Sequence, residues 1–316
     1  MRRAAPASAL LVLATLAGCS GSGGEGAASG PATSARPDPG AVTSSAAPPS
    51  SPSSPPSSRP STARPTASAR PSPRPSASPS PSAEGRWRPR PGLAWQWQLD
   101  GRVDPSVDVP VYDIDGFENS AADVARLHRA GRKVICYVNV GAWEDFRPDR
   151  DAFPASVLGR SNGWEGERWL DIRRLSVLRP IMASRFDMCR DKGFDAVEPD
   201  LMEGYANDTG FPLTGADQLR YNRMIAELAH ERGLSVGLKN DLAQIPRLVR
   251  HFDFAVNEEC AEFDECEALT PFVAAGKAVF HVEYAEPNSA FCADSRRLGL
   301  SSMRKKLALG VWRAPC

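Results

Sequence analysis

The sequence predicts an α/β fold, a single (β/α)8 TIM barrel that follows a long disordered N-terminal segment. Two observations predict the barrel: short apolar β-prone runs alternate with helix-like segments over the last two thirds of the chain, and a glycine repeatedly separates a helix-like segment from the next run. Such alternation favours a parallel sheet, and eight units favour its closure into a barrel. A third observation predicts the disordered segment, because no aromatic residue precedes Trp87.

The first residues are typical of an export signal. Residues 1–3 are basic at two positions, residues 9–16 are apolar but too few to span a bilayer, and small residues lead up to Cys19. This pattern resembles a bacterial lipoprotein signal, so we expect a signal peptide over 1–18 and a lipid on Cys19. The alternative is an ordinary cleaved signal in which the cysteine is incidental. Both export the protein, and the first predicts an extracellular lipoprotein anchored to the cell membrane.

Residues 19–86 are almost entirely Ser, Pro, Ala, Gly and Thr with scattered arginines. Such a segment cannot bury enough apolar surface to offset the entropy of ordering, so we expect a disordered linker. Extended Pro-rich chain spans about 3.1 Å per residue, which lets the linker carry the folded domain on the order of 100 Å or more from its anchor.

The expected domain is residues 87–316, a length that suits one barrel. It holds 35 acidic and 30 basic residues, whereas residues 1–86 hold 3 and 8, so the net charge of zero conceals a basic segment and an acidic domain. An acidic domain argues against nucleic acid as a partner and is compatible with a cationic ligand. We expect a monomer.

The elements follow in order along the domain. Strands are expected at 94–99, 109–114, 133–140, 194–198, 234–239, 252–257, 277–283 and 307–312, and helices at 120–130, 175–192, 216–232, 242–250, 264–275 and 289–298. Glycines that end helices stand at 131, 193, 233, 276 and 299. The long connection at 141–174 is rich in Trp, Asp and Arg and could form one wall of a cleft. Its tryptophans either stack on sugar rings or close a small local core.

Cysteine usage predicts disulfides. Apart from Cys19 the chain has six cysteines, an even number in an exported domain. Proximity in sequence favours Cys260 with Cys266 and Cys292 with Cys316. Strand alternation places Cys136 on the face that a helix carrying Cys189 would cover. That last pair is either a disulfide or two buried thiols.

Two of the expected strands end in carboxylates. Residues 193–200 read Gly-Phe-Asp-Ala-Val-Glu-Pro-Asp, and residues 252–260 read Phe-Asp-Phe-Ala-Val-Asn-Glu-Glu-Cys. Catalytic groups of a (β/α)8 enzyme lie where strands end, and hydrolysis of a glycosidic bond needs a carboxylic acid and a carboxylate. The two strand ends therefore indicate a glycoside hydrolase. The alternative is that the acids cap or begin the following helices.

The motifs also carry a family resemblance. In order, residues 95–99, 112–115, 134–139 with 141–144, 169–173, 193–200, 237–241, 257–260 and 281–284 resemble the barrel domain of glycoside hydrolase family 114, over essentially all of 93–316. The resemblance implies an endo-α-1,4-polygalactosaminidase that cleaves within chains of α-1,4-linked galactosamine. The family often has Asn after the aspartate of the fourth strand, where this chain has Leu201.

Carried over by position, the resemblance implies that Asp200 and Glu258 are the catalytic pair. We assign Asp200 as nucleophile and Glu258 as acid/base, with Glu259 as the competitor for the second role because only one of two adjacent strand residues faces the bond. Further acids at strand ends exceed what hydrolysis requires and would hold a cationic amino-sugar polysaccharide. The expected substrate-binding residues are Asp113, Asp115, Tyr137, Glu198, Lys239, Glu259 and Glu283, with Asp241 at a further strand end. Lys239 has a structural ion pair as its alternative role.

No cofactor motif is present. The histidines are scattered, and His281 and Glu283 on one strand face lack a third ligand, so we expect no metal and no other cofactor. A second class of function is a carbohydrate-binding lipoprotein whose acidic cleft captures cationic oligosaccharides without cutting them. The carboxylate pair separates the two classes, because a binding protein has no need of two acids that flank one bond.

Overall fold

The structure is a computed structural model that describes residues 85–316. The expected signal peptide at 1–18, the lipidation site Cys19 and the linker up to residue 84 lie outside the described residues. Across 85–316, the helices are all too short or too polar to cross a membrane.

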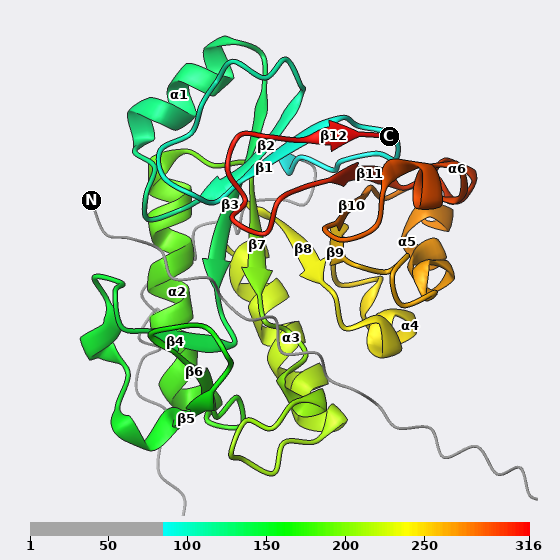
Figure 1. Ribbon diagram of the computed structural model, residues 1–316. Helices are drawn as coiled ribbons and strands as arrows, with labels where there is room; N and C mark the ends of the chain where they lie inside the picture. The colour runs from blue at the N-terminus through cyan, green and yellow to red at the C-terminus, as the bar shows by residue number, and fades with distance from the viewer. Residues whose placement is uncertain (1–84) are drawn as a thin grey trace, which may run out of the picture. The chain divides into compact units, whose positions relative to one another are not determined.

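Eight parallel strands form the centre of the domain (Figure 1). Each pairs in parallel with the next of these strands in the order of the chain, so a crossover connection joins every neighbouring pair. The strands are β1 (Trp95–Gln98), β2 (Val111–Asp115), β3 (Lys133–Asn139), β7 (Ala196–Asp200), β8 (Ser235–Lys239), β9 (Phe254–Glu258), β10 (Val279–Glu283) and β11 (Ser301–Arg304).

The curled sheet is joined at its two ends by side chains and by one loop. No strand pairing links β1 to β11 among the described residues. Instead Trp95 Nε1 donates to the carbonyl oxygen of Ser301 at 2.8 Å, and the backbone N–H of Leu99 donates to the carbonyl of Leu309 at 3.0 Å. The expected barrel is thus present, with a seam between its first and last parallel strands.

The eighth strand was expected in the wrong place. It is Ser301–Arg304, directly after a helix, and not residues 307–312, which form a turn and a loop. Leu307, Val311 and Trp312 are exposed in this loop. The apolar run suggested a strand, but the left-handed Gly299 that ends the preceding helix returns the chain to the sheet at once, at two serines.

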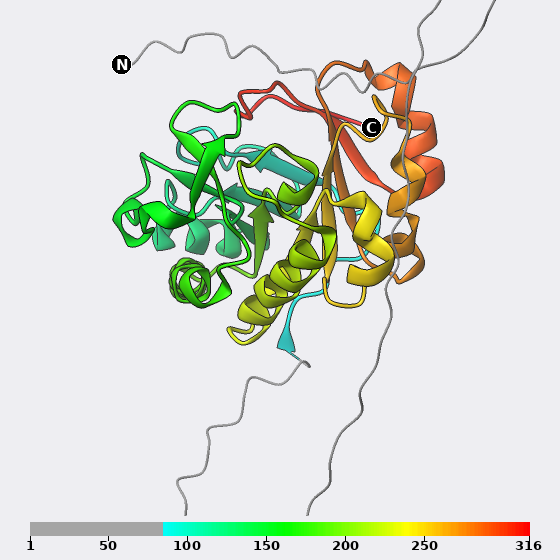
Figure 2. The same cartoon turned by 90° about the horizontal axis from the view of Figure 1, so that it is seen from below.

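Helices lie outside the curve of the sheet (Figure 2). They are α1 (Ala121–Arg129), α2 (Leu175–Lys192), α3 (Gly215–His230), α4 (Ile245–Leu248), α5 (Thr270–Ala274) and α6 (Asn288–Leu298), with 3-10 turns η2 (Arg150–Ala152), η3 (Ala155–Val157), η4 (Gly204–Ala206), η5 (Leu242–Gln244) and η6 (Cys266–Leu269). Ser120 and Thr214 begin α1 and α3 with capping boxes. All six expected helices are found, the fourth and fifth shortened by the 3-10 turns that precede them.

The long connection after β3 contains a small antiparallel sheet. Its strands are β4 (Ala142–Glu144), β5 (Leu158–Ser161) and β6 (Glu167–Leu170), in the order β4-β6-β5. Trp169 is buried in it and Trp164 is exposed. A further short strand, β12 (Ala314–Pro315), runs antiparallel to β11.

Period-two alternation divides the core into two layers. One set of strand residues packs against the helices, and the other fills the inside of the curled sheet: Trp95, Trp97, Val111, Ile135, Ala196, Phe254, Val256, Phe280, Val282 and Met303. Gly237 belongs to the inner set, where an added Cβ would lie 2.5 Å from the ring of Phe254. Glycine at that position lets the aromatic ring cross the inside of the sheet.

All six cysteines of residues 85–316 form disulfides. Cys260 is bonded to Cys266 and Cys292 to Cys316, which ties down the C-terminus. Cys136 on β3 is bonded to Cys189 on α2, so the disulfide alternative for this pair is confirmed.

Candidate active site

The inner face of the sheet changes from apolar to polar toward the carboxyl ends of the strands. Every second residue of each strand faces inward, and toward the carboxyl ends these inward-facing residues are polar. Seven of them come together there: Asp113 on β2, Tyr137 on β3, Glu198 and Asp200 on β7, Lys239 on β8, Glu258 on β9 and Tyr284 just after β10. Six of these seven were expected from the sequence as site residues. The register of the parallel strands places them at one rim.

Lys239 joins the two expected catalytic carboxylates. Its Nζ lies 2.8 Å from Asp200 Oδ1 and 2.9 Å from Glu258 Oε2, and it is almost wholly buried. The same ammonium group lies 5.0 Å from the ring centroid of Trp97. Since both oxygens contact one nitrogen, the two carboxylates face each other across a single cation.

Asp200 is held as a carboxylate. Its Oδ2 accepts a hydrogen bond from the Tyr137 hydroxyl at 2.7 Å, and its Oδ1 accepts one from Lys239. Burial would raise the pKa of Asp200, but the charge of Lys239 and the hydrogen bonds from Lys239, Tyr137 and the Leu201 amide outweigh it and lower that pKa. Asp200 therefore remains ionised, as a nucleophile must be.

Glu258, and not its neighbour Glu259, contacts this cluster. The hydroxyl of Tyr284 donates to Glu258 Oε1. Glu259 follows with a left-handed backbone (φ 64°), so β9 ends at Glu258, and among the described residues Glu259 forms no ion pair with Lys239. Burial followed by the charge of Glu258 raises the pKa of Glu259 to about 7.

A buried carboxyl pair lies beneath Lys239. Glu198 Oε1 is 3.7 Å from Lys239 Nζ, and Glu198 Oε2 accepts a hydrogen bond from Trp97 Nε1 at 3.0 Å. No N–H or hydroxyl group of the described residues reaches either oxygen of Asp113. Burial and then the charge of Glu198 raise the pKa of Asp113 well above its usual value. The raised pKa favours the protonated form of Asp113, and burial raises the pKa of Glu198 to about 7.

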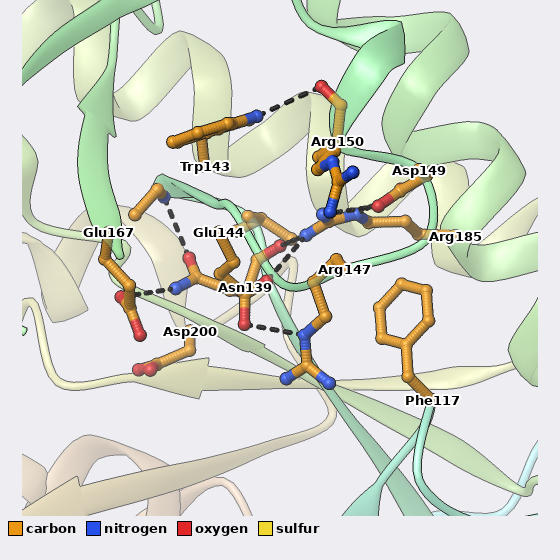
Figure 3. Close-up of polar contacts among 12 residues, drawn as sticks. Phe117, Asn139, Trp143, Glu144, Arg147, Asp149, Arg150, Glu167, Arg185 and Asp200 are labelled. Atoms are coloured by element: carbon orange, nitrogen blue, oxygen red, sulfur yellow. Dashed lines mark hydrogen bonds and ion pairs between the residues drawn. The ribbon is translucent and has the colours of Figure 1, made fainter. Parts of the chain in front are cut away.

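An ion network fixes the wall beside Asp200 (Figure 3). Arg147 binds Asp115 through two hydrogen bonds, at 3.1 and 2.6 Å, and Glu144 at 2.7 Å. Arg185 binds Glu144 at 3.3 Å and the carbonyl oxygen of Asn139 at 2.5 Å. The carboxylate of Asp115 is thus committed to Arg147 and to two backbone N–H groups.

Glu167 of β6 extends from this wall toward Asp200 (Figure 3). It accepts hydrogen bonds from the amides of Asn162 at 2.8 Å and Asn139 at 3.4 Å. Burial, followed by the charges of Glu144 and Asp200, raises its pKa to about 7. No basic side chain of residues 85–316 forms an ion pair with it.

Glu283 lies apart from the cluster. It is fully buried on the helix side of β10, where its Oε1 accepts from the Ala261 amide at 2.8 Å and contacts His281 Nε2 at 2.7 Å. The parity of residue 283 explains this, because 280, 282 and 284 face inward. Cys260, Cys266 and His281 are the group of described residues with the spacing of metal ligands, but a disulfide uses both sulfur atoms.

Several site residues have no counterpart among those singled out in the sequence. Alternation along β1 and β10 would have indicated Trp97 and Tyr284, since both continue the inward-facing set. Glu167 and Arg147 come from the long connection, where no period marks the direction of a side chain. Asn240, which accepts a hydrogen bond from the Glu258 amide, and Glu203, which binds the turn at Asn240, depend on a left-handed turn that no local pattern predicted.

Comparisons with known proteins identify the family of the chain. The model of glycoside-hydrolase family GH114 matches residues 76–316. Among solved structures, Aspergillus fumigatus Ega3 in complex with galactosamine is 40% identical, with a TM-score of 0.68 over 73% of this chain and 98% of that chain. The glycoside hydrolase domain of PelA from Pseudomonas aeruginosa, at 16% identity and a TM-score of 0.57 over 71% of this chain and 98% of that one, shares the fold. The search of curated proteins found no match. The chain belongs to glycoside-hydrolase family GH114 and is a glycoside hydrolase.

Proposed function

We propose that the protein is an endo-acting hydrolase that cleaves polymers of α-1,4-linked galactosamine outside the cell, with Asp200 as nucleophile and Glu258 as acid/base. The observation that carries this proposal is the pair of carboxylates, from neighbouring parts of one rim, that contact the same ammonium group of Lys239. A protein that only binds sugar has no use for two acids facing each other in this way.

The spacing of the pair supports a retaining mechanism. Because Lys239 Nζ lies 2.8 Å from Asp200 Oδ1 and 2.9 Å from Glu258 Oε2, these two oxygens are at most about 6 Å apart, a bound that allows the separation of roughly 5 to 5.5 Å in retaining enzymes. Inverting enzymes need room for a water molecule and separate the groups by about 6.5 to 9.5 Å.

The chemistry then proceeds in two steps. Asp200 attacks the anomeric carbon while Glu258 transfers its proton to the leaving oxygen, and the glycosidic bond breaks. Glu258 next takes a proton from water, whose oxygen attacks the same carbon and releases Asp200. Tyr137 and Tyr284 hold one oxygen of each carboxylate in place through both steps.

The electrostatics support a cationic substrate. Glu167 and Glu259 are half-buried carboxylates that form no ion pair with the described residues, and they lie on the Asp200 side and the Glu258 side of the pair. Ammonium groups of galactosamine units would supply the missing positive charge. The complex of Ega3 with galactosamine favours the same sugar.

The export signal and linker complete the proposal. A lipid on Cys19 would anchor the protein in the membrane, and the linker would let a monomeric domain reach polymer outside the cell. Radiolabelled fatty acid incorporated into the wild type and lost in Cys19→Ser tests the anchor.

The activity is tested on de-N-acetylated and on fully N-acetylated polygalactosamine, by following reducing ends. We expect products from the first polymer, few from the second, and a loss of about 10³-fold or more in kcat for Asp200→Asn. Asp294→Asn, an exposed partner of Arg297 on α6, is the matched control and should act as wild type. NMR of the first products should show the α-anomer, as retention requires.

Two outcomes would contradict the proposal. Activity that survives in Asp200→Asn would remove Asp200 from the mechanism. Tight binding of the de-N-acetylated polymer by the wild type without any new reducing ends would favour the carbohydrate-binding lipoprotein.

A further inference from the structure

Glu203 links the end of β7 to the turn that follows β8, at strand ends that carry candidate catalytic groups. It lies three residues after Asp200, in the loop that leaves β7, and is directed at the turn that follows Lys239 on β8. Its Oε2 accepts a hydrogen bond from the Asp241 amide at 2.7 Å, and its Oε1 accepts a longer one from Asn240 Nδ2 at 3.5 Å. No step of the proposed mechanism uses Glu203.

The turn that Glu203 holds is in an uncommon conformation. Asn240 and Asp241 are consecutive non-glycine residues with φ values of 49° and 51°. Left-handed backbone is sparsely populated for such residues and persists where surrounding contacts determine it. Here those contacts are the Glu203 carboxylate on one side and, on the other, the Asn222 amide, which donates to Asp241 Oδ2 at 2.9 Å.

The side chain of Asn240 joins this turn to Glu258, the proposed acid/base. Its Oδ1 accepts hydrogen bonds from the Glu258 backbone amide at 3.0 Å and from Asn257 Nδ2 at 3.2 Å. Because the oxygen of the amide is used at β9, its NH₂ group must face Glu203. A protonated Glu203, or a glutamine in its place, would present a hydrogen-bond donor to that NH₂ group. If the Asn240 amide then rotated, its Oδ1 would lose the hydrogen bond from the Glu258 backbone amide.

The charge of Glu203 is sensitive to pH in the neutral range. Burial raises its pKa to about 7, against the hydrogen bond from the Asp241 amide and the charge of Lys239. The titratable groups around it are Asp241, whose pKa burial raises to about 8, together with Tyr205, Lys239 and Asp200. Loss of a proton from Glu203 therefore strengthens the acceptor that fixes the turn.

We propose that Glu203 is a positioning residue: its carboxylate fixes the left-handed Asn240–Asp241 turn and, through the Asn240 amide, sets Lys239 and Glu258 relative to Asp200. This inference rests on the proposed function for its kinetic test. Misplacement of a catalytic group by about 1 Å can cost on the order of 100-fold in rate.

The kinetic test compares Glu203→Gln with wild type and with Glu231→Gln, a control whose exposed carboxylate contacts Arg179 and Arg232 at the C-terminal end of α3. We expect kcat for Glu203→Gln to fall about tenfold or more with KM changed less than about threefold, since positioning affects the reaction more than binding. The acidic limb of the wild-type kcat profile near pH 7 should be absent in this variant. A kcat within twofold of wild type and an unchanged profile would overturn the proposal.

Asn240→Gly provides a variant that is expected to fold. Glycine accepts the left-handed backbone without strain, so the turn is kept while the amide bridge to Glu258 is removed. If Glu203 acts through Asn240, this variant reproduces the loss in kcat, and the double variant is no slower than either single one. Losses that multiply in the double variant would show that the two residues act separately.

Amide hydrogen exchange gives a measurement that does not need activity. In Glu203→Gln, segments that contain Asp241 and Glu258 should exchange faster, whereas the inner core strands β1 and β2 should not change. If the wild type cleaves no polymer, the proposed function fails but this measurement still decides the role of Glu203. Unchanged exchange over 240–258 would refute it.

Discussion

At the scale of single residues, Lys239 determines the electrostatics of the site. Its buried ammonium group lies within 4 Å of three carboxylates, on Glu198, Asp200 and Glu258. Each of these groups would be costly to bury as an isolated charge. The sequence placed Lys239 at a strand end and left two roles open, a contact to the substrate or a structural ion pair. The distances show that it forms ion pairs with both catalytic candidates, Asp200 and Glu258.

Replacing Lys239 with methionine tests this account. Removing one partner of a buried ion network leaves uncompensated charge, so Lys239→Met should lower the free energy of unfolding by about 3 kcal/mol at pH 7. The loss should be smaller at pH 5, where the carboxyl groups can take up protons instead. Urea unfolding at both pH values measures the difference, and Lys306→Met, an exposed lysine over Trp312, is the control. Equal losses at both pH values would contradict the assignment.

At the scale of elements, the wall formed by β4, β5 and β6 depends on arginine. Arg185 projects from α2, is almost fully buried, and binds the carbonyl oxygen of Asn139, the carboxylate of Glu144 and both carboxylate oxygens of Asp149. The small sheet that carries Glu167 is therefore attached to the barrel by charge-assisted hydrogen bonds as well as by apolar packing.

Arg185→Met should detach this wall while the barrel remains folded. We expect a loss of about 3 kcal/mol or more in the free energy of unfolding, because Glu144 and Asp149 lose a partner. Hydrogen exchange should increase over 141–174 and stay slow in β7 to β10. Arg190→Met, on the exposed face of the same helix, serves as the matched control. An Arg185→Met protein with wild-type exchange in 141–174 would show that packing alone holds the wall.

At the scale of the whole molecule, buried carboxyl groups set how stability depends on pH. Burial raises the pKa to about 7 for Glu167, Glu198, Glu203 and Glu259, and to about 8 for Asp241. The folded domain thus binds these protons more tightly than the unfolded chain, whose carboxyl groups titrate near pH 4. Between those values the unfolded state holds fewer protons, so stability falls as pH rises.

We therefore expect the domain to be more stable at pH 5 than at pH 7. Below about pH 4 the sign reverses, because Asp200 and Asp123 have lowered pKa values and lose their partners when protonated. Burial lowers the pKa of Lys305 to about 7. Above pH 7 this group therefore makes stability rise with pH, which is opposite in sign to the effect of the carboxyl groups. Urea unfolding at pH 4, 5, 6 and 7 measures the slope, and Glu167→Gln should reduce it. Stability that rises from pH 5 to pH 7 would disprove the account.

The sequence by itself determined the parallel fold, seven of the eight strands, the six helices and two of the three disulfides, and it left Cys136 and Cys189 as either a disulfide or two buried thiols. Each has a local cause: apolar alternation with period two, helical spacing ended by glycine, or cysteines brought together by proximity and strand parity. The strand-end pattern marked several acids, among them Asp200 and Glu258, and the choice of these two as the catalytic pair came from the family resemblance and stays a prediction.

The tertiary structure alone decided which acids meet. The register of the strands brought Asp200, Glu258 and Lys239 together, and the position of Glu283 in its strand directed that side chain to the helices. Arg147, from the long connection, forms an ion pair with Asp115. The eighth strand was misplaced because β11 begins with two serines, whose burial depends on neighbouring strands and on no pattern of their own. Left-handed turns at Asn240 and Glu259 depend likewise on distant partners, and these turns set the direction of Glu258.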